Sequence, residues 1–250
     1  MDDKKDYQDQ IEGRNSVIEL LNSEKDVNKI IISKGEKHGS INKIISMAKQ
    51  KGIVVVEADR FKLDTMSETK NHQGVIAIVP PFNYYTIEDI LEYAYAKNED
   101  PFIVILDGIE DPHNLGSVIR SAECSGVHGV IIPKRRAATV NATVSKASAG
   151  ATEHMRIAKV TNLTDTIKEL KEQGLWIIGA EAEGKTEYYN QDLKGPIGLV
   201  IGSEGYGTSR LVKENCDILI NIPMKGKISS LNASVCAGII MYEVLKQRLV

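Results

Sequence analysis

The sequence lacks the marks of an exported or membrane protein. Its 250 residues contain no apolar run near the length that spans a bilayer, and residues 1–10 are almost wholly charged or polar, unlike a leader peptide. Only three cysteines occur, and no two of them form a Cys-x-x-Cys pair. We therefore expect a cytoplasmic protein without a membrane partner, in which Cys124, Cys216 and Cys236 are reduced core residues.

The sequence also lacks an excess of basic charge. Lys and Arg number 31 against 34 Asp and Glu, which gives a formal charge of −3. Bulk basicity therefore cannot carry binding to nucleic acid, and any RNA site must be a local patch. The densest basic cluster, Lys134-Arg135-Arg136, suits either a phosphate contact or a solubilising loop. The five histidines form no ligand-spaced pair, so we expect no metal site.

The hydrophobic pattern divides the chain into four stretches. We expect a disordered tail at residues 1–10, a small α/β unit at 11–83, a linker helix within 84–100 and a larger domain at 101–250. In the small unit, helices are expected at 11–21 and 41–51, and strands at 27–33, 53–56 and 75–79. The strand at 53–56 is expected to be buried.

A polar loop of the small unit ends in Asn71-His72-Gln73-Gly74. Its amide, imidazole and glycine suit hydrogen bonding to unpaired bases, and they suit a solvated turn equally well. The linker helix that follows is expected to begin after Thr86, because Asp89 is placed to complete a capping box.

The larger domain alternates strands and helices. A mainly parallel sheet with helices on both faces is the natural arrangement for such a pattern. The small residues at 145–151 permit another backbone to approach closely. Apolar runs predict strands at 102–106, 130–132, 175–178, 197–201 and 217–221, with a helix at 163–173.

Two motifs follow predicted strands of this domain. After strand 102–106, Asn114 is placed to cap a helix, and Arg120 falls nearly two turns further along it. After strand 197–201, the glycines of residues 202–207 expose backbone N–H groups that suit a nucleotide-like ligand. Alone, such a glycine-rich turn is weak evidence of function.

The third motif, residues 222–235, joins a strand end to a largely apolar helix that we expect to begin near Leu231. Ser229, Ser230 and Asn232 place hydroxyl and amide groups where a helix N-terminus collects polar ligands. Taken alone, Ser230 is most simply a helix cap.

Together, the three motifs strongly resemble those of the SpoU/TrmH family of RNA ribose 2′-O-methyltransferases. The likeness extends over residues 101–250. In the small unit, Arg14, Asp64 and residues 72–74 resemble the substrate-binding domain of the subgroup that modifies 23S ribosomal RNA.

The resemblance implies a fold and a reaction. The fold is a SPOUT-type parallel sheet with a deep trefoil knot, preceded by a smaller, ribosomal-protein-like α/β domain that binds the RNA substrate. The cofactor is S-adenosylmethionine, and the active form is a homodimer whose sites are completed across the interface. The reaction is 2′-O-methylation of the ribose of a guanosine in 23S ribosomal RNA.

The resemblance also assigns residues by their motif positions. Backbone groups of Gly202, Ile222 and Leu231 hold the cofactor, with the turn at residues 179–181 as a further contact. The catalytic set is Asn114, Arg120, Glu204, Ser230 and Asn232.

Methyl transfer to a ribose hydroxyl is limited by the nucleophile, which the site must orient while it stabilises the developing alkoxide. In this family, the arginine at the Arg120 position is often assigned the role of general base. A guanidinium, however, holds its proton so strongly that losing it is costly. We expect Arg120 to grip a substrate phosphate and lower the hydroxyl pKa electrostatically, the proton leaving through water. Glu204 would position Arg120 or the loop, Ser230 would hold the cofactor loop, and Asn114 and Asn232 would orient Arg120 and ribose oxygens.

Three other functions compete with this one. A non-catalytic RNA-binding assembly factor could keep the fold, although the intact motif set argues against it. A generic nucleotide-binding α/β enzyme lacks support, because no Walker lysine or Rossmann acidic partner appears at the required spacing. A transfer-RNA methyltransferase of the same family is the nearest rival, and the small unit favours ribosomal RNA.

Overall fold

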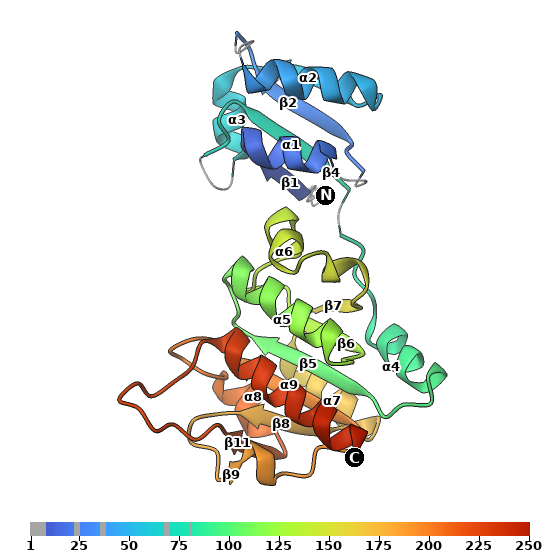
Figure 1. Ribbon diagram of the computed structural model, residues 1–250, viewed down its shortest axis with the longest axis vertical. Coiled ribbons are helices and arrows are strands. Elements are labelled where there is room, and N and C mark those ends of the chain that lie inside the picture. Colours follow the sequence, from blue (N-terminus) through green and yellow to red (C-terminus); the bar gives the residue numbers. More distant parts are fainter. Residues whose placement is uncertain (1–8, 23–25, 36–38, 68–70, 81) are drawn as a thin grey trace, which may run out of the picture. The chain divides into compact units, whose positions relative to one another are not determined.

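The computed structural model describes residues 9–22, 26–35, 39–67, 71–80 and 82–250 and divides into two compact units, Met1–Asn83 and Tyr84–Val250 (Figure 1). The tail expected at residues 1–10 lies outside the described residues except for its last two positions. There, Asp9 and Gln10 begin a β-strand.

The first unit is an α/β fold, as predicted, but its sheet has four strands, because β1 adds to the three that were expected. Strand β1 pairs with β4 and β4 with β2 in antiparallel fashion, whereas β2 and β3 are parallel, giving the order β1-β4-β2-β3. The strands are β1 (Asp9–Glu12), β2 (Lys29–Ser33), β3 (Val54–Ala58) and β4 (Val75–Val79), and the helices are α1 (Arg14–Asn22), α2 (Ser40–Gln50) and α3 (Arg60–Met66).

Two expectations for this unit need correction. The helix predicted from residue 11 begins at Arg14, because Ile11 belongs to β1 and pairs with Ala77 of β4. The stretch 53–56 is not a buried strand, since β3 is the sheet edge and exposes 60% of Val54. A run of valines cannot tell an edge strand from a central one, because the difference depends on which neighbours the fold supplies.

The second unit contains a seven-stranded, wholly parallel sheet in the order β7-β6-β5-β10-β8-β11-β9. Helices cover both faces, which confirms the predicted arrangement (Figure 1). The strands are β5 (Phe102–Asp107), β6 (Gly129–Pro133), β7 (Ile157–Val160), β8 (Trp176–Ala180), β9 (Thr186–Glu187), β10 (Ile197–Gly202) and β11 (Ile218–Asn221). The helices are α4 (Ile87–Ala96), α5 (Pro112–Cys124), α6 (Ala142–Ala147), α7 (Leu163–Glu172), α8 (Arg210–Asn215) and α9 (Ala233–Leu249), with short 3-10 turns at Ala151–Glu153 and Tyr188–Asn190.

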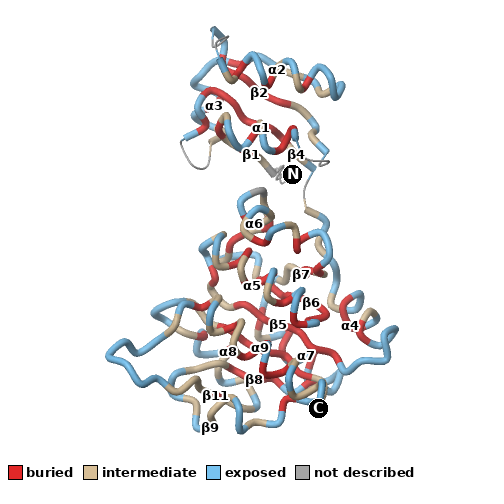
Figure 2. Tube along the Cα trace, viewed as in Figure 1, coloured by how far each residue is buried: buried red, intermediate tan, exposed pale blue. Residues whose placement is uncertain are grey.

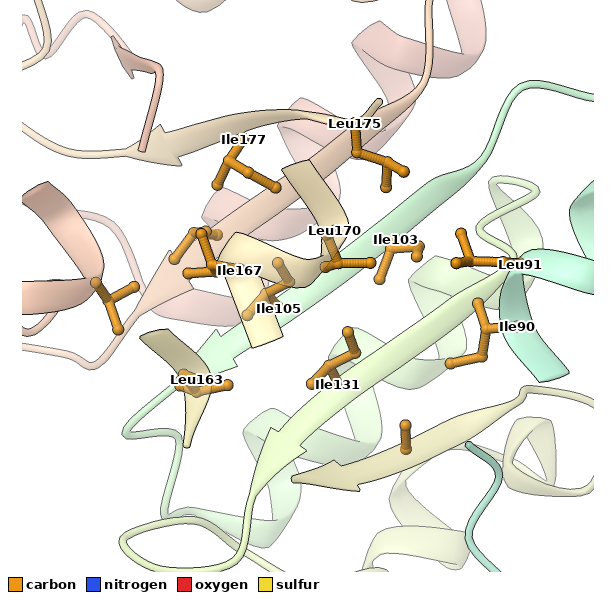
Figure 3. Packing of buried hydrophobic residues seen from close by; sticks show 13 residues of the cluster. Ile90, Leu91, Ile103, Ile105, Ile131, Leu163, Ile167, Leu170, Leu175 and Ile177 are labelled. Carbon is orange, nitrogen blue, oxygen red and sulfur yellow. The ribbon is translucent and has the colours of Figure 1, made fainter. Parts of the chain in front are cut away.

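One face of this sheet packs against α4, α7 and α8 through a cluster of buried aliphatic side chains (Figure 3). Ile103 and Ile105 of β5 meet Ile167 and Leu170 of α7 there. The central strands are buried throughout, as the tube in Figure 2 shows for β5 and β6. This core holds the carboxyl ends of the strands, from which the site is built, in fixed register.

The helix expected as a linker is α4, and it belongs to the second unit. Its capping box is present, with Thr86 and Asp89 each bonding the other's backbone N–H. Ile90 and Leu91 lie in the aliphatic cluster of the sheet. The unit boundary falls at Asn83, before this helix, so α4 packs as part of the larger unit.

Helix α5 packs against both α6 and α9. Close approach depends on Gly116, where an added Cβ would lie 2.5 Å from the Ala147 Cβ, so the small residues at 145–151 act as predicted. The cysteines are free, but Cys124 is exposed, because it ends α5 on its solvent side, and is not the core residue expected. Over the residues described, no helix combines the length and apolarity needed to cross a bilayer.

Candidate active site

Two neighbouring cavities lie at the carboxyl edge of the parallel sheet, where open α/β sheets bind their ligands. The first cavity has a volume of about 600 Å³ and is lined by the segments that follow β8, β10 and β11. The second has a volume of about 460 Å³ and is lined mainly by the segments that follow β5 and β10. Both volumes lie in the range of small-molecule sites.

The first cavity collects most of the residues that the motifs predicted. Gly202, Ile222 and Leu231 line it, and so do Glu204 and Ser230. The loop from Ile222 to Leu231 passes along it, and most of that loop is exposed (Figure 2). The second and third motifs, about twenty residues apart in the sequence, therefore form one wall.

Gly202 is a glycine for a steric reason. An added Cβ would lie 2.2 Å from the carbonyl carbon of Gly207 and 2.3 Å from the Thr208 nitrogen. The turn folds back tightly because Ser203 and Gly207 exchange backbone hydrogen bonds of 3.0 and 2.9 Å. Gly205 and Gly207 both have positive φ, which glycine adopts without strain.

Glu204 is the centre of the polar cluster. Its Oε1 accepts hydrogen bonds from Asn114 Nδ2 at 3.0 Å, from Ala233 N at 3.2 Å and from Asn232 Nδ2. Asn232 Nδ2 also donates to Asn114 Oδ1 at 2.9 Å. The structure thus brings together three predicted residues from three motifs, and we call Asn114, Glu204 and Asn232 the amide-carboxylate cluster.

The helix caps differ from those expected. Asn232, not Ser230, caps α9, because its Oδ1 accepts from Ser234 N and Val235 N at 3.0 and 3.3 Å. Asp111, not Asn114, caps α5 and accepts from His113 N at 2.7 Å. The Asp-Pro pair was the available signal, since proline favours the first helical position directly after a capping residue.

Two of the predicted catalytic residues, Arg120 and Asn232, line neither cavity. Asn232 still reaches the site, because it bonds to Asn114 and Glu204, which do line the cavities. Arg120 lies exposed on α5. A separation of six residues turns the helix by about 240°, so Arg120 and Asn114 face different directions. Within the described part of this single chain, the guanidinium stands apart from the amide-carboxylate cluster.

Glu181 is a structural residue of the site whose side chain the sequence did not single out. The carboxylate is only 10% exposed, accepts from Thr208 N at 2.8 Å and lies 3.4 Å from Lys213 Nζ. It therefore ties the segment after β8 to the segment after β10. Its position directly after a buried strand, like that of Gly202, was the signal that could have found it.

Cys236 also lines the first cavity, from the first turns of α9. Burial, and secondarily the Glu181 carboxylate, raise the pKa of this thiol to about 11. The thiol is therefore protonated near neutral pH and is a poor nucleophile.

The second cavity shares Ser203, Glu204, Tyr206 and Gly207 with the first. Its other wall carries Asn114, the residues after β5 and Arg136. All three residues of the basic cluster 134–136 are exposed, but only Arg136 lines the cavity.

In the first unit, the residues singled out for base recognition contact one another. His72 is 3% exposed, its Nε2 lies 2.8 Å from Asp64 Oδ1, and its Nδ1 accepts from Gly74 N at 3.0 Å. Arg14 Nε donates to the Gln73 carbonyl at 2.9 Å. The imidazole is therefore neither a surface for bases nor part of a solvated turn, because both of its nitrogens are bonded inside the unit. Among the described residues, no His, Cys, Asp and Glu cluster could hold a metal ion.

A parallel α/β sheet with ligand cavities at its carboxyl edge and a polar cluster between them defines an enzyme of the nucleotide-cofactor kind. The comparisons narrow this class. The SpoU rRNA Methylase family model matches residues 101–242, and the model for RNA 2′-O ribose methyltransferase substrate binding matches residues 10–85. The chain belongs to the SpoU family of RNA methyltransferases.

Relatives and solved structures agree. YacO of Bacillus subtilis strain 168, a protein named for the TrmH family of tRNA/rRNA methyltransferases, is 48% identical over 96% of each chain. An AdoMet-bound rRNA methyltransferase from Sinorhizobium meliloti superposes with a TM-score of 0.64 at 24% identity, covering 97% of this chain and 88% of that one. A TrmH/SpoU tRNA-modifying enzyme from A. aeolicus is 30% identical with a TM-score of 0.56, over 60% of this chain and 77% of that one.

Proposed function

We propose that this protein transfers a methyl group from S-adenosylmethionine to the 2′-hydroxyl of a guanosine ribose in 23S ribosomal RNA. The observation that carries the proposal is the amide-carboxylate cluster, placed where the two cavities meet. One cavity would supply the methyl donor and the other the acceptor. Work on ribosomal RNA would place the protein in the cytoplasm.

The first cavity suits the cofactor in size and charge. Its charged lining residues are all carboxylates, Glu181, Glu183 and Glu204. Lys213 pairs with the first two, and the group as a whole keeps a net negative charge. S-adenosylmethionine is a cation overall, because its sulfonium and ammonium outweigh its carboxylate, so an acidic lining favours it. Gly202, Ile222 and Leu231 would hold it through backbone groups, and Ser230 would hold the loop around it. When bound, the cofactor supplies an electrophilic methyl group on a good leaving group.

The amide-carboxylate cluster would orient the ribose. Asn232 uses both of its amide hydrogens, on Asn114 and Glu204, and Asn114 uses one of its two. Among the residues that the structure describes, one Asn114 N–H and the second Glu204 oxygen have no partner, and they would serve a substrate. Together they would fix a hydroxyl as both donor and acceptor, and such prior positioning is what a weak nucleophile needs. The role of Glu204 would then be to position the two amides, and not to position Arg120.

Arg120 would act in a homodimer. A guanidinium that lines neither cavity of its own chain fits a site completed by a second copy. The exposed face of α9 supports such an interface, because Val235, Tyr242 and Leu249 are largely apolar and about half or more exposed. Arg120 would grip a substrate phosphate there and stabilise the developing alkoxide. The deep trefoil knot stays a prediction.

Ribosomal RNA is the favoured substrate because both units have counterparts in the rRNA methyltransferase from Sinorhizobium meliloti, whereas the tRNA-modifying enzyme from A. aeolicus matches over 60% of this chain. The substrate-binding model also spans residues 10–85. An added domain of this kind is expected where the target lies within a large folded RNA.

The test is methyl transfer from labelled cofactor to purified 23S ribosomal RNA and, in parallel, to total transfer RNA from cells that lack this gene. We expect label in ribosomal RNA, at a 2′-O-methyl guanosine, and calorimetric binding of the cofactor. Light scattering should give a dimer mass. Label confined to transfer RNA would select the rival substrate, and cofactor binding without transfer to either RNA would favour the assembly factor.

A further inference from the structure

The second cavity is a binding site in its own right, and its chemistry indicates the nucleotide that it takes. It lies against the cofactor cavity across a shared wall, with Asn114 and Glu204 in its lining. If the first cavity holds the methyl donor, the second is where the acceptor must lie. The inference below rests on the proposed function in this respect.

Most charged groups around this cavity are already engaged. Asp107 accepts from Ser209 N at 2.7 Å, and Asp111 accepts from His113 N at 2.7 Å. Glu204 holds the two amides. The remaining charged lining residues are Glu110 and Arg136. Over the described part of the chain, these two side chains make no internal hydrogen bond or ion pair, so both are available to a ligand.

The balance of charge decides which part of a nucleotide enters. Four carboxylates and a single guanidinium line the cavity, so a negatively charged RNA phosphate would be repelled from its interior. A base and a ribose carry no such penalty. The phosphate would stay beside Arg136, whose positive φ of 56° sets the backbone of this loop in an uncommon conformation.

The two free groups are coupled through the backbone. Ala138 N donates to the Ile109 carbonyl at 2.8 Å, which ties the loop that carries Arg136 to the loop that carries Glu110. The carboxylate of Glu110 and the guanidinium of Arg136 therefore lie on two loops that are hydrogen-bonded to each other.

We propose that the second cavity selects the target nucleotide, with Glu110 accepting two hydrogen bonds from a guanine and Arg136 binding its phosphate. Guanine presents adjacent N1–H and N2–H donors, which match the two oxygens of one carboxylate. Adenine and cytosine place a ring acceptor beside their amino group, and uracil flanks its one N–H with carbonyl oxygens. A carboxylate therefore favours guanine over the other three bases, and a good bidentate pair discriminates by about tenfold or more.

The experiment measures binding, apart from methyl transfer. The four nucleoside 5′-monophosphates are titrated into the full-length protein by ligand-observed NMR, in the presence of S-adenosylhomocysteine. We expect guanosine monophosphate to bind about tenfold more tightly than the other three. Glu110→Gln, which offers one acceptor and one donor, should reduce this preference to about twofold or less. Arg136→Ala should weaken all four nucleotides by a similar factor and keep the preference.

Matched controls are Glu172→Gln, an exposed acid at the end of α7, and Arg135→Ala, the exposed neighbour of Arg136 outside the cavity. Neither should change nucleotide affinity. Equal affinities in the wild type, or a guanine preference that survives Glu110→Gln, would overturn the assignment. A preference that depends on Glu110 in a protein that methylates no RNA would instead sink the proposed function and leave the cavity assignment standing.

Discussion

Each unit holds a polar cluster. In the small unit it is made by Asp64 and His72, which are close in the sequence, and in the large unit by Asn114, Glu204 and Asn232, from three distant segments. The two clusters keep different amounts of hydrogen-bonding capacity. Both imidazole nitrogens of His72 are bonded within the unit and the ring is buried. The amide-carboxylate cluster is exposed and retains a donor and an acceptor. The small unit's cluster therefore serves stability, and the large unit's cluster can serve a ligand.

The large unit holds a second example of the stabilising kind. His128 is buried, its Nδ1 accepts from Phe102 N at 2.9 Å and its Nε2 lies 2.9 Å from Glu99 Oε2. This is the bonding pattern of His72. Both units thus contain a buried histidine that is bonded to a carboxylate and to a backbone N–H. Residue type alone therefore does not show which polar residues are functional.

The largest effect is expected at the glycine turn that presents Glu204. Gly202→Ala places a methyl group against the backbone of Gly207 and Thr208, which cannot move aside, so we expect a stability loss of about 3 kcal/mol or more and loss of cofactor binding. Gly205→Ala is the matched control. No atom lies within 4 Å of its added Cβ, so only its positive φ matters and the cost should be about 1–2 kcal/mol. Denaturant unfolding compares the two, and equal losses would refute the steric argument.

Glu204→Ala should separate function from stability most cleanly. It leaves two amides without their shared acceptor at an exposed site, so methyl transfer should fall by about 100-fold or more while the unfolding midpoint changes little. Glu204→Gln keeps one acceptor oxygen and should lose less. Single-turnover methylation measures this, with Glu169→Gln on the exposed side of α7 as the control. Near-normal transfer in the alanine variant would place Glu204 outside the reaction.

His72→Ala should have the opposite profile. It removes one buried and one part-buried hydrogen bond and leaves Gly74 N without its partner, so the first unit should lose about 2 kcal/mol of stability. Cofactor binding by the second unit should not change. Calorimetric unfolding and cofactor titration test both statements, with the exposed Lys49→Ala as the control. A loss of RNA affinity at unchanged stability would show that the imidazole contacts RNA after all.

The smallest effect concerns pH. Burial lowers the pKa of His128, although the Glu99 carboxylate opposes this. The unfolded chain therefore takes up the proton first, near the ordinary histidine pKa of about 6.5, and the native state resists it. This contribution to stability is present above that pH and declines as the pH falls below it. Urea unfolding at pH 7.5 and 5.5 should show a smaller decline in His128→Gln than in the wild type, and an equal decline would exclude this origin.

The sequence predicted the parts of the fold that depend on local pattern. Strands β5 and β10 were found because central parallel strands are continuous apolar runs. Strand β7 and helix α8 were not found, since their short, mixed sequences become regular only against their neighbours. The exposure of Val54 was missed for the same reason, because the position of a strand in the sheet order is a property of the whole unit.

The site, like the fold, was predicted from the sequence only in part. The motif residues identified which amides and carboxylate would meet, and the structure brought Asn114, Glu204 and Asn232 within hydrogen-bonding distance. The motifs could not predict the direction in which each side chain points. Arg120 shares a helix with Asn114 but points elsewhere. The motifs singled out the turn at residues 179–181 for its backbone, and the role of the Glu181 side chain was missed because it bonds a backbone N–H on another loop.

The contacts of Glu204 link the width of the first cavity to the amide-carboxylate cluster. The same glycine loop forms part of the wall of the first cavity and carries the carboxylate that joins α5 to the start of α9. A displacement of this loop that widens the cavity must break the bonds to Asn114, Asn232 and Ala233 together. A ligand that needed the cavity widened by that route would therefore exchange only while the amide-carboxylate cluster is taken apart.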